Sequence, residues 1–350
     1  MKQKLFAVAA LATLSGAALA QSSVTTYGSF DGGLRNQSNV NAAGDSVLTM
    51  GSNGTFRSNR LGFKGEEALG GGMSANFVLE AGFNSGTGAL NNTTGILFQR
   101  EAHVGLAGDF GAIDVGHNYT LAYKTILAFD PFAYRYPSIT YALSATAGTR
   151  KDNDIQYTKQ VGDFTARAEY ALGEVVGSNA NGSTEALAAS YASGALKLGA
   201  SYAVSKQNVG TGTVISYQDF THYALGGAYT FGAATAAVGY VKQKQETLSV
   251  DNTSQWTWAG LSYKLASPLS LTGAWYRTKA VNAAASATVA AGNSKKNLYM
   301  AGLTYDLSKR TVLYSEVDVN KLDGGYASGG TTKLNQTRQT GISAGINHMF

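Results

Sequence analysis

Apolar and polar residues alternate along much of the chain. Within residues 196–204 the even-numbered positions, including Leu198 and Tyr202, are apolar or aromatic, whereas the odd-numbered positions are small or polar. Residues 164–172 repeat this alternation. A period of two places successive side chains on opposite faces of a β-strand. Strands of soluble sandwiches usually have about 5–6 residues, but these runs approach the roughly 9–11 residues that cross a bilayer at a tilt. The pattern therefore predicts membrane-crossing strands whose polar face meets water.

Short turns alternate with longer polar stretches between these strands, which is typical of an outer-membrane barrel. We therefore predict an all-β fold, a 16-stranded antiparallel transmembrane β-barrel, in which strand pairing satisfies every backbone polar group. The predicted strands cover residues 22–36, 55–66, 72–84, 96–107, 110–119, 149–159, 163–172, 185–192, 195–206, 219–230, 233–244, 255–265, 269–279, 296–306, 311–321 and 339–350.

The start of the chain has a different character. Lys2 and Lys4 precede an apolar run, and small residues follow it up to Ala20. This order is typical of a secretory signal peptide, and the apolar run is shorter than the roughly 20 residues of a spanning helix. We predict a signal peptide at residues 1–20 and a barrel at residues 21–350. Removal of the two lysines lowers the formal net charge from +5 to +3.

Composition excludes several classes of protein. The chain has no cysteine, which excludes a disulfide scaffold, a thiolate metal site and a cysteine nucleophile. Its 4 histidines lack the spacing of a zinc hydrolase, and no G-x-S-x-G motif occurs. The net charge of +5 is small for a nucleic-acid-binding protein. We predict no enzyme activity, no cofactor or metal and no nucleic-acid partner, with a barrel-borne hydrolase as a weak alternative.

Five segments carry a more specific pattern. They are residues 24–34, 58–73, 98–106, 305–314 and 345–350. Together they resemble the trimeric general porins of Gram-negative bacteria, especially the beta-proteobacterial branch. The resemblance extends from the predicted mature start to the last residue. It implies a homotrimer in the outer membrane, in contact with lipid and lipopolysaccharide, that lets small hydrophilic solutes pass passively.

The longest connection, about residues 120–148, is the candidate constriction of the channel. It contains Pro131, Pro137 and several aromatic residues, and long structured loops are often functional. In the resembled family the corresponding loop folds into the barrel and narrows it. The resemblance implies that Asp130 presents an acid there. An ordinary extracellular loop is the alternative.

Basic residues are expected on the wall opposite this loop. The resemblance assigns Arg60, Arg100 and Arg150 to that wall, and arginine keeps its charge at any physiological pH. Alternation places Lys64 on the face of Arg60. Alternation around Arg100 is unclear, because its face also holds Val104 and other apolar residues. Arg35 and Arg57 are weaker candidates for the channel interior.

The family also uses its first strands for the subunit interface. This implies that Gln99, Glu101 and His103, on the face opposite Arg100, contact a neighbouring subunit.

The charges of the loop predict what the channel prefers. Lys124, Asp130 and Arg135 give the loop a slight positive balance, and arginine rows favour anions. We therefore predict a diffusion channel with a weak to moderate preference for anions. The alternatives are a substrate-specific channel for phosphate or dicarboxylates, and a plugged adhesin or receptor barrel.

Overall fold

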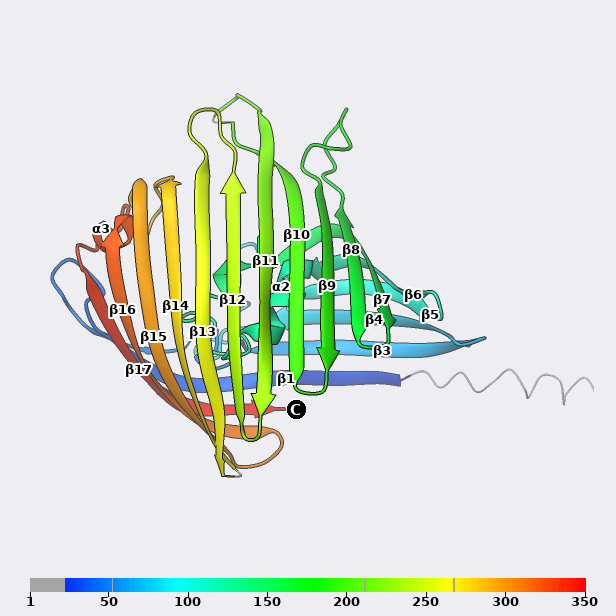
Figure 1. The fold of residues 1–350 in the computed structure, drawn as a ribbon, viewed down its shortest axis with the longest axis horizontal. Helices are drawn as coiled ribbons and strands as arrows, with labels where there is room; N and C mark the ends of the chain where they lie inside the picture. The colour runs from blue at the N-terminus through cyan, green and yellow to red at the C-terminus, as the bar shows by residue number, and fades with distance from the viewer. Residues whose placement is uncertain (1–22, 52, 211, 267) are drawn as a thin grey trace, which may run out of the picture.

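The computed structural model describes residues 23–350 apart from 52, 211 and 267, so the predicted signal peptide at 1–20 lies outside the described residues. Antiparallel strands wrap around one axis and close into a barrel (Figure 1). The strands are β1 (Ser23–Gln37), β2 (Val47–Met50), β3 (Arg60–Gly70), β4 (Met73–Gly82), β5 (Glu101–Gly108), β6 (Gly111–Tyr119), β7 (Arg150–Val161), β8 (Phe164–Ala171), β9 (Thr184–Ser193), β10 (Leu196–Asn208), β11 (Tyr217–Phe231), β12 (Ala234–Gln245), β13 (Asn252–Ala266), β14 (Leu269–Ala283), β15 (Gly292–Asp306), β16 (Thr311–Gly324) and β17 (Arg338–Met349).

The described part of the sheet has 17 strands, and all except the short β2 form the wall. The predicted 16-stranded antiparallel barrel is therefore confirmed. β1 closes it by pairing with β3 through Ser23–Ser29 and with β17 through Ser29–Gln37. The Phe350 N–H donates to the Gly28 carbonyl at 3.2 Å, and the Phe350 carbonyl accepts from the Gly28 N–H at 3.1 Å. The last residue of the chain thus completes the closing pair.

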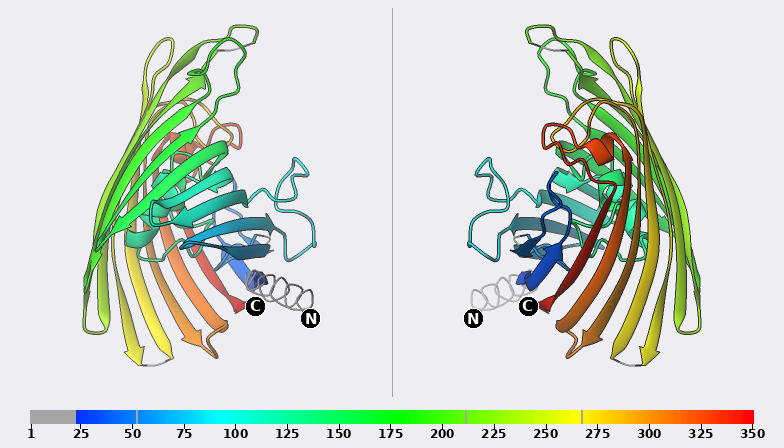
Figure 2. Two further views of the ribbon diagram at one scale, coloured as in Figure 1. Left: turned by 90° about the vertical axis from the view of Figure 1, so that its right-hand side faces the viewer. Right: turned by 90° about the vertical axis from the view of Figure 1, so that its left-hand side faces the viewer.

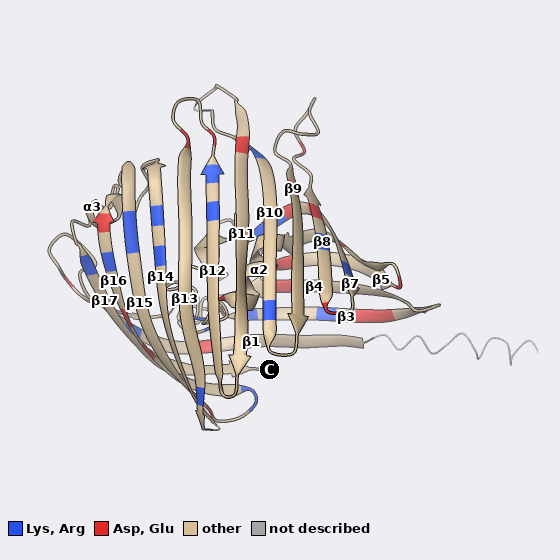
Figure 3. Cartoon of the chain, in the orientation of Figure 1, with Lys and Arg blue, Asp and Glu red and all other residues tan. Residues whose placement is uncertain are grey.

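The two faces of the wall have opposite character. On β10, Leu198 and Tyr202 are 48% and 51% exposed, whereas Ser201 and Ala203 are buried. The outer face is therefore apolar and the inner face small or polar, which is the reverse of a soluble protein and the pattern of an outer-membrane barrel. Charges on β9–β13 lie near the strand ends (Figure 3). The alternation predicted from the sequence is confirmed on these faces.

Two wall strands start later than predicted. The strand predicted at 55–66 corresponds to β3, and the strand predicted at 96–107 corresponds to β5. Each begins five residues after its predicted start. For β3 the cause is Asp31, whose carboxylate accepts from the backbone N–H groups of Thr55 at 2.9 Å and Arg57 at 3.3 Å. These bonds hold the segment before β3 out of the sheet.

The connection from β6 to β7 folds into the barrel (Figures 1 and 2). It contains α2 (Leu121–Ile126) and two short 3-10 helices, η1 (Leu127–Phe129) and η2 (Leu143–Ala145). The hydroxyl of Thr120 accepts from the Tyr123 N–H at 3.2 Å and caps α2. No helix in the described chain is long and apolar enough to cross a membrane. We call this connection, residues 120–149, the inner loop.

Aromatic side chains of the inner loop pack against the inner face of β11–β16. Wall glycines make room for them: a Cβ on Gly226 would lie 2.4 Å from the ring of Phe129, and one on Gly260 would lie 2.5 Å from Pro131. The Trp258 indole N–H donates to the Phe129 carbonyl at 2.9 Å. The inner loop is therefore seated on one side of the barrel.

The turn in the inner loop has an unusual backbone. Ala133, Tyr134 and Tyr136 have φ of 49°, 56° and 56°, which is uncommon for residues other than glycine. The Asp130 carboxylate accepts from the Tyr134 N–H at 2.8 Å and from the Phe132 N–H at 3.4 Å. Such conformations persist where surrounding contacts hold them in place, and these buried contacts do so here.

Candidate pore constriction

A cavity of about 410 Å³ lies between the inner loop and the wall at β3, the residues just before β5, and β7. We call it the arginine cavity. Three of the predicted wall residues and one predicted loop residue line it, together with a weaker candidate. These are Arg57, Arg60, Arg100, Arg135 and Arg150. Among the described residues, no aspartate or glutamate lines this cavity.

Two polar groups behind the cavity organise the wall arginines. The Glu80 carboxylate accepts from Nε of Arg100 at 2.5 Å and lies 3.8 Å from a terminal nitrogen of Arg60. The Tyr119 hydroxyl accepts from Arg100 and from Arg150, each at 2.7 Å. One carboxylate therefore serves two guanidinium groups, whereas Arg150 is held by a tyrosine hydroxyl.

Arg100 reaches the interior although alternation along β5 would point it outward. Val104, which has the same parity, is 60% exposed. Arg100 precedes β5 by one residue, so the alternation of side chains along the strand does not fix its direction. Its side chain turns inward to Glu80. Glu101 pairs with Glu80 in register, and directly paired residues share a face. The subunit-facing position predicted for Gln99, Glu101 and His103 is therefore wrong: Gln99 lines the arginine cavity, and Glu101 and His103 face the barrel interior.

Arg57 and Arg135 have no ion-pair partner within the described chain. The Arg135 guanidinium lies 5.0 Å from the centroid of the Phe56 ring. Burial, together with the positive charges of Arg135 and Arg60, lowers the pKa of Arg57 to about 10. Burial also lowers the pKa of Arg135. Arginine nevertheless remains protonated at physiological pH, so both groups contribute uncompensated positive charge.

Asp130 and Lys124 lie away from the cavity. Asp130 is 5% exposed, and its carboxylate accepts from the Tyr276 hydroxyl at 2.5 Å. This corrects the expectation that Asp130 presents an acid to the channel: it anchors the inner loop to β14. Lys124 points from α2 to the wall, where its ammonium donates to the side-chain carbonyl of Gln156. Of the three predicted loop residues, the structure brings only Arg135 to the wall arginines.

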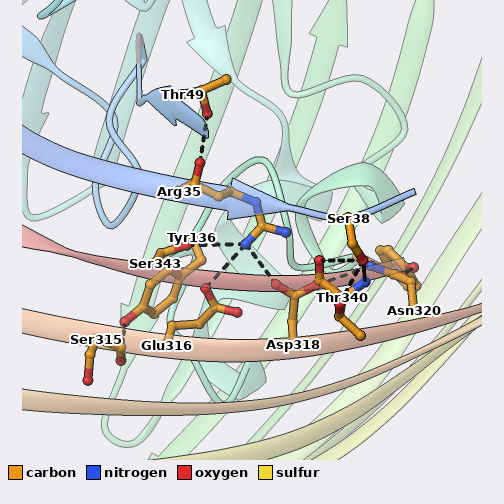
Figure 4. A network of polar contacts seen from close by, with 11 residues as sticks. Arg35, Ser38, Thr49, Tyr136, Ser315, Glu316, Asp318, Asn320, Thr340 and Ser343 are labelled. Atoms are coloured by element: carbon orange, nitrogen blue, oxygen red, sulfur yellow. Dashed lines mark hydrogen bonds and ion pairs between the residues drawn. The ribbon is translucent and has the colours of Figure 1, made fainter. Parts of the chain in front are cut away.

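Lys64 lies on the inner face of β3, as predicted, because Leu61 and Phe63 are exposed on the outer face. Its ammonium lies 5.6 Å from the centroid of the Tyr27 ring, and it does not line the arginine cavity. Arg35, a weaker candidate, lies elsewhere in the interior and forms ion pairs on β16 (Figure 4).

Sequence reasoning missed Glu80 and Tyr119. Glu80 is an isolated acid in a predicted strand, which is a signal for an internal ion pair because charges are costly toward lipid. Tyr119 is one of 20 tyrosines and nothing in the sequence distinguishes it. Within the described residues, no group of three or more histidine, aspartate or glutamate side chains is placed to hold a metal ion.

Comparisons with known sequences agree with this architecture. The sequence model of the Gram-negative porin family matches residues 7–325. An outer membrane porin protein of Bordetella pertussis is 29% identical over 405 aligned positions, which cover 100% of both chains. Outer membrane porin protein 32 of Delftia acidovorans is 30% identical over 383 positions, again with 100% of both chains covered.

Solved structures lead to the same family. An anion-selective porin from Comamonas acidovorans has a TM-score of 0.77 and 25% identity, covering 94% of this chain and 100% of that chain. OmpT of Vibrio cholerae in a trimer form has a TM-score of 0.67 at 16% identity, covering 94% and 99%, which shows the shared fold. The family match extends over most of the chain, and porins of this family are channels rather than enzymes. The chain therefore belongs to the Gram-negative porin family and is an outer-membrane porin.

Proposed function

We propose that this porin is a passive diffusion channel for small hydrophilic solutes that prefers anions. The observation that supports the preference is the arginine cavity, which five guanidinium groups line; among the described residues Glu80 is the only carboxylate that forms an ion pair with any of them. Fixed charges in confined water act more strongly than charges at an open surface. Rows of arginine favour anions, so chloride and small carboxylates pass more readily than potassium. The anion-selective porin from Comamonas acidovorans supports the same direction.

The test is the reversal potential across planar bilayers in a potassium chloride gradient. We expect the wild type to show anion preference. We expect the double variant Arg57→Gln, Arg135→Gln to reduce it several-fold, because both groups line the cavity and neither has an ion-pair partner in the described part of the chain. Arg310→Gln removes one positive charge from an exposed turn and should leave the reversal potential unchanged. Cation preference in the wild type would overturn the proposal, and absence of conductance would favour the plugged barrel instead.

A substrate-specific anion channel is the second candidate. The observation that favours it is the gathering of Arg57, Arg135 and Arg150, none of which has a carboxylate partner within the described residues. Such a cluster suits a multivalent anion such as phosphate or a dicarboxylate. Saturable block of the chloride current by millimolar phosphate or malate would favour this candidate. A current that changes only in proportion to ion concentration would favour the general channel.

We propose further that the protein forms homotrimers in contact with lipid and lipopolysaccharide. β3–β6 are shorter than the long strands on the other side, and part of the connection between β4 and β5 projects outward beside them (Figure 2). Val104 and Leu106 leave an apolar outer surface there. The resemblance to trimeric porins supports this assembly. Light scattering of the detergent-solubilised protein should give three times the mass of the chain, and a monomer mass would contradict it.

A further inference from the structure

A second cavity, of about 430 Å³, lies on the side of the barrel where the long loops are. Residues from the inner loop, from the ends of β1 and β15–β17, and from the connections near 40, 288 and 326–334 line it. Of the described residues, Ser138 alone lines both this cavity and the arginine cavity. Ligand pockets usually have about 300–1,000 Å³, so this space suits a small molecule. We call it the loop-side cavity.

Lys296 carries the only lysine charge among the described residues of this lining. Its ammonium lies 3.9 Å from the centroid of the Tyr141 ring and 4.8 Å from that of the Tyr326 ring. Within the described residues no carboxylate lies within 4.0 Å of it, although an ammonium has three N–H donors. The two rings hold the cation in place, and its donors are left for an oxygen acceptor from outside the chain.

Arg35, the other cation of the lining, is already engaged (Figure 4). It donates to Asp318 at 2.7 Å, to Glu316 at 3.3 Å and to the Ser343 hydroxyl at 3.2 Å. Neither carboxylate lines the loop-side cavity. The cavity therefore presents one available positive charge, which matches a ligand with a single negative charge rather than phosphate or a dicarboxylate.

The rest of the lining favours an apolar ligand body. Ile139, Leu322 and Leu334 supply aliphatic surface next to the two tyrosine rings. Aromatic rings pack favourably in offset or edge-to-face contact with tyrosine. Gln37 and Gln339 add amide groups that can bond to a polar substituent.

We propose that the loop-side cavity binds aromatic monocarboxylates, with the carboxylate on the Lys296 ammonium and the ring between the tyrosines and the aliphatic side chains. An inorganic anion would satisfy the ammonium but leave the apolar surface uncovered. A neutral aromatic amide would cover that surface but leave the ammonium without an anion. Both properties together define the ligand class. Binding here does not depend on the anion preference set at the arginine cavity.

The test uses 4-fluorobenzoate as the probe and ¹⁹F NMR of the detergent-solubilised protein as the measurement. We expect the ¹⁹F signal of 4-fluorobenzoate to broaden saturably with the wild type. The signal of 4-fluorobenzamide should not broaden saturably, and acetate should not compete with 4-fluorobenzoate. Lys296→Met should weaken binding about tenfold or more, since a charge-assisted hydrogen bond is lost. Lys295→Met is the matched control, because the adjacent lysine pairs with Asp323 at 3.6 Å and does not line the cavity. It should bind like the wild type.

Two further readings keep the result decisive if Lys296→Met folds poorly. Tyr326→Leu retains the charge but removes one ring, and we expect a smaller loss of affinity together with wild-type reversal potential. Benzoate added on each side of a planar bilayer should reduce the chloride current saturably in the wild type. Equal binding by Lys296→Met and the wild type, or equal competition by benzamide and benzoate, would overturn the proposal, as would absence of saturable binding to the wild type.

Discussion

The partner of each charged residue determines what that residue offers to a solute. Glu80 holds Arg100 and approaches Arg60, whereas Arg57 and Arg135 line the same cavity with no carboxylate partner in the described chain. Arginines of identical chemistry therefore differ in available charge. The number of basic residues alone would not reveal this difference.

Glu80→Gln is predicted to change selectivity and stability in opposite directions. Loss of the carboxylate leaves Arg100 buried without a counter-charge, which costs about 3 kcal/mol, and raises the positive potential of the arginine cavity. We expect a lower urea midpoint and a stronger anion preference in reversal-potential measurements. Asp109→Asn, in an exposed turn, removes the same charge and should change neither quantity. A weaker anion preference in Glu80→Gln would contradict this account.

Asp130→Asn is predicted to act on stability alone, and in a pH-dependent way. Burial raises the pKa of Asp130, although the Tyr276 hydroxyl and the N–H groups of Tyr134 and Phe132 oppose the shift. The folded state therefore binds this proton more tightly than the unfolded state. The resulting stabilisation is complete below the ordinary pKa of 3.8 and is lost as the pH rises through the raised pKa.

Urea midpoints measured at pH 4 and pH 8 test the direction of this change in stability with pH. The stability of the wild type relative to Asp130→Asn should fall as the pH rises, because asparagine does not titrate. Reversal potentials of the two proteins should agree, since Asp130 does not line the arginine cavity. A wild type that gains stability relative to Asp130→Asn as the pH rises, or a clear change in selectivity, would show that Asp130 is ionised at the channel.

At the level of elements, the position of the inner loop depends on how closely the wall allows it to approach. Phe129 and Pro131 lie where a side chain on Gly226 or Gly260 would be. The loop thus occupies the β11–β16 side and leaves the arginine cavity on the other. The width of the channel therefore depends on glycines in the wall strands as well as on the inner loop.

Gly260→Ala is predicted to narrow the channel. Its Cβ would push Pro131 away from the wall, toward the wall arginines, so single-channel conductance should fall and the current should become noisier. Gly273→Ala is the matched control on the adjacent strand β14, because a Cβ there meets no atom within 4 Å. Unchanged conductance in Gly260→Ala, or an equal fall in both variants, would contradict the proposed seat of the loop.

The wall was predictable from the sequence because the side chains of each strand alternate between lipid and the barrel interior, so apolar and polar residues alternate along the strand. Leu198 on the outer face and Ser201 on the inner face show this alternation directly. Prediction from alternation fails for residues that lie outside the regular strands. Arg100 turns inward before β5 starts, and Asp31 holds the chain before β3 out of the sheet through contacts between distant residues. The buried position of Asp130 depends on Tyr276, which is 146 positions away in the chain.

At the scale of the whole molecule, closure separates two kinds of surface. The barrel pairs every wall strand with two neighbours, so the outer face can be apolar while the inner face carries the charge. The formal net charge of the chain is only +5. Its arrangement nevertheless places five guanidinium groups at one cavity, so the local field differs from what the total charge suggests.

The dependence of selectivity on salt tests this view of the whole channel. The Debye length falls from about 30 Å at 0.01 M to about 3 Å at 1 M, so the attraction of anions from the mouth of the barrel should weaken as salt rises. At a fixed concentration ratio across the bilayer, we expect the anion preference to decline steadily with mean salt concentration. It should still exceed that of Arg57→Gln, Arg135→Gln at high salt, because groups lining a confined cavity are screened less than exposed ones. A preference independent of salt would indicate selection by size. A preference that Arg310→Gln lowers as much as the cavity variant would indicate selection by net charge.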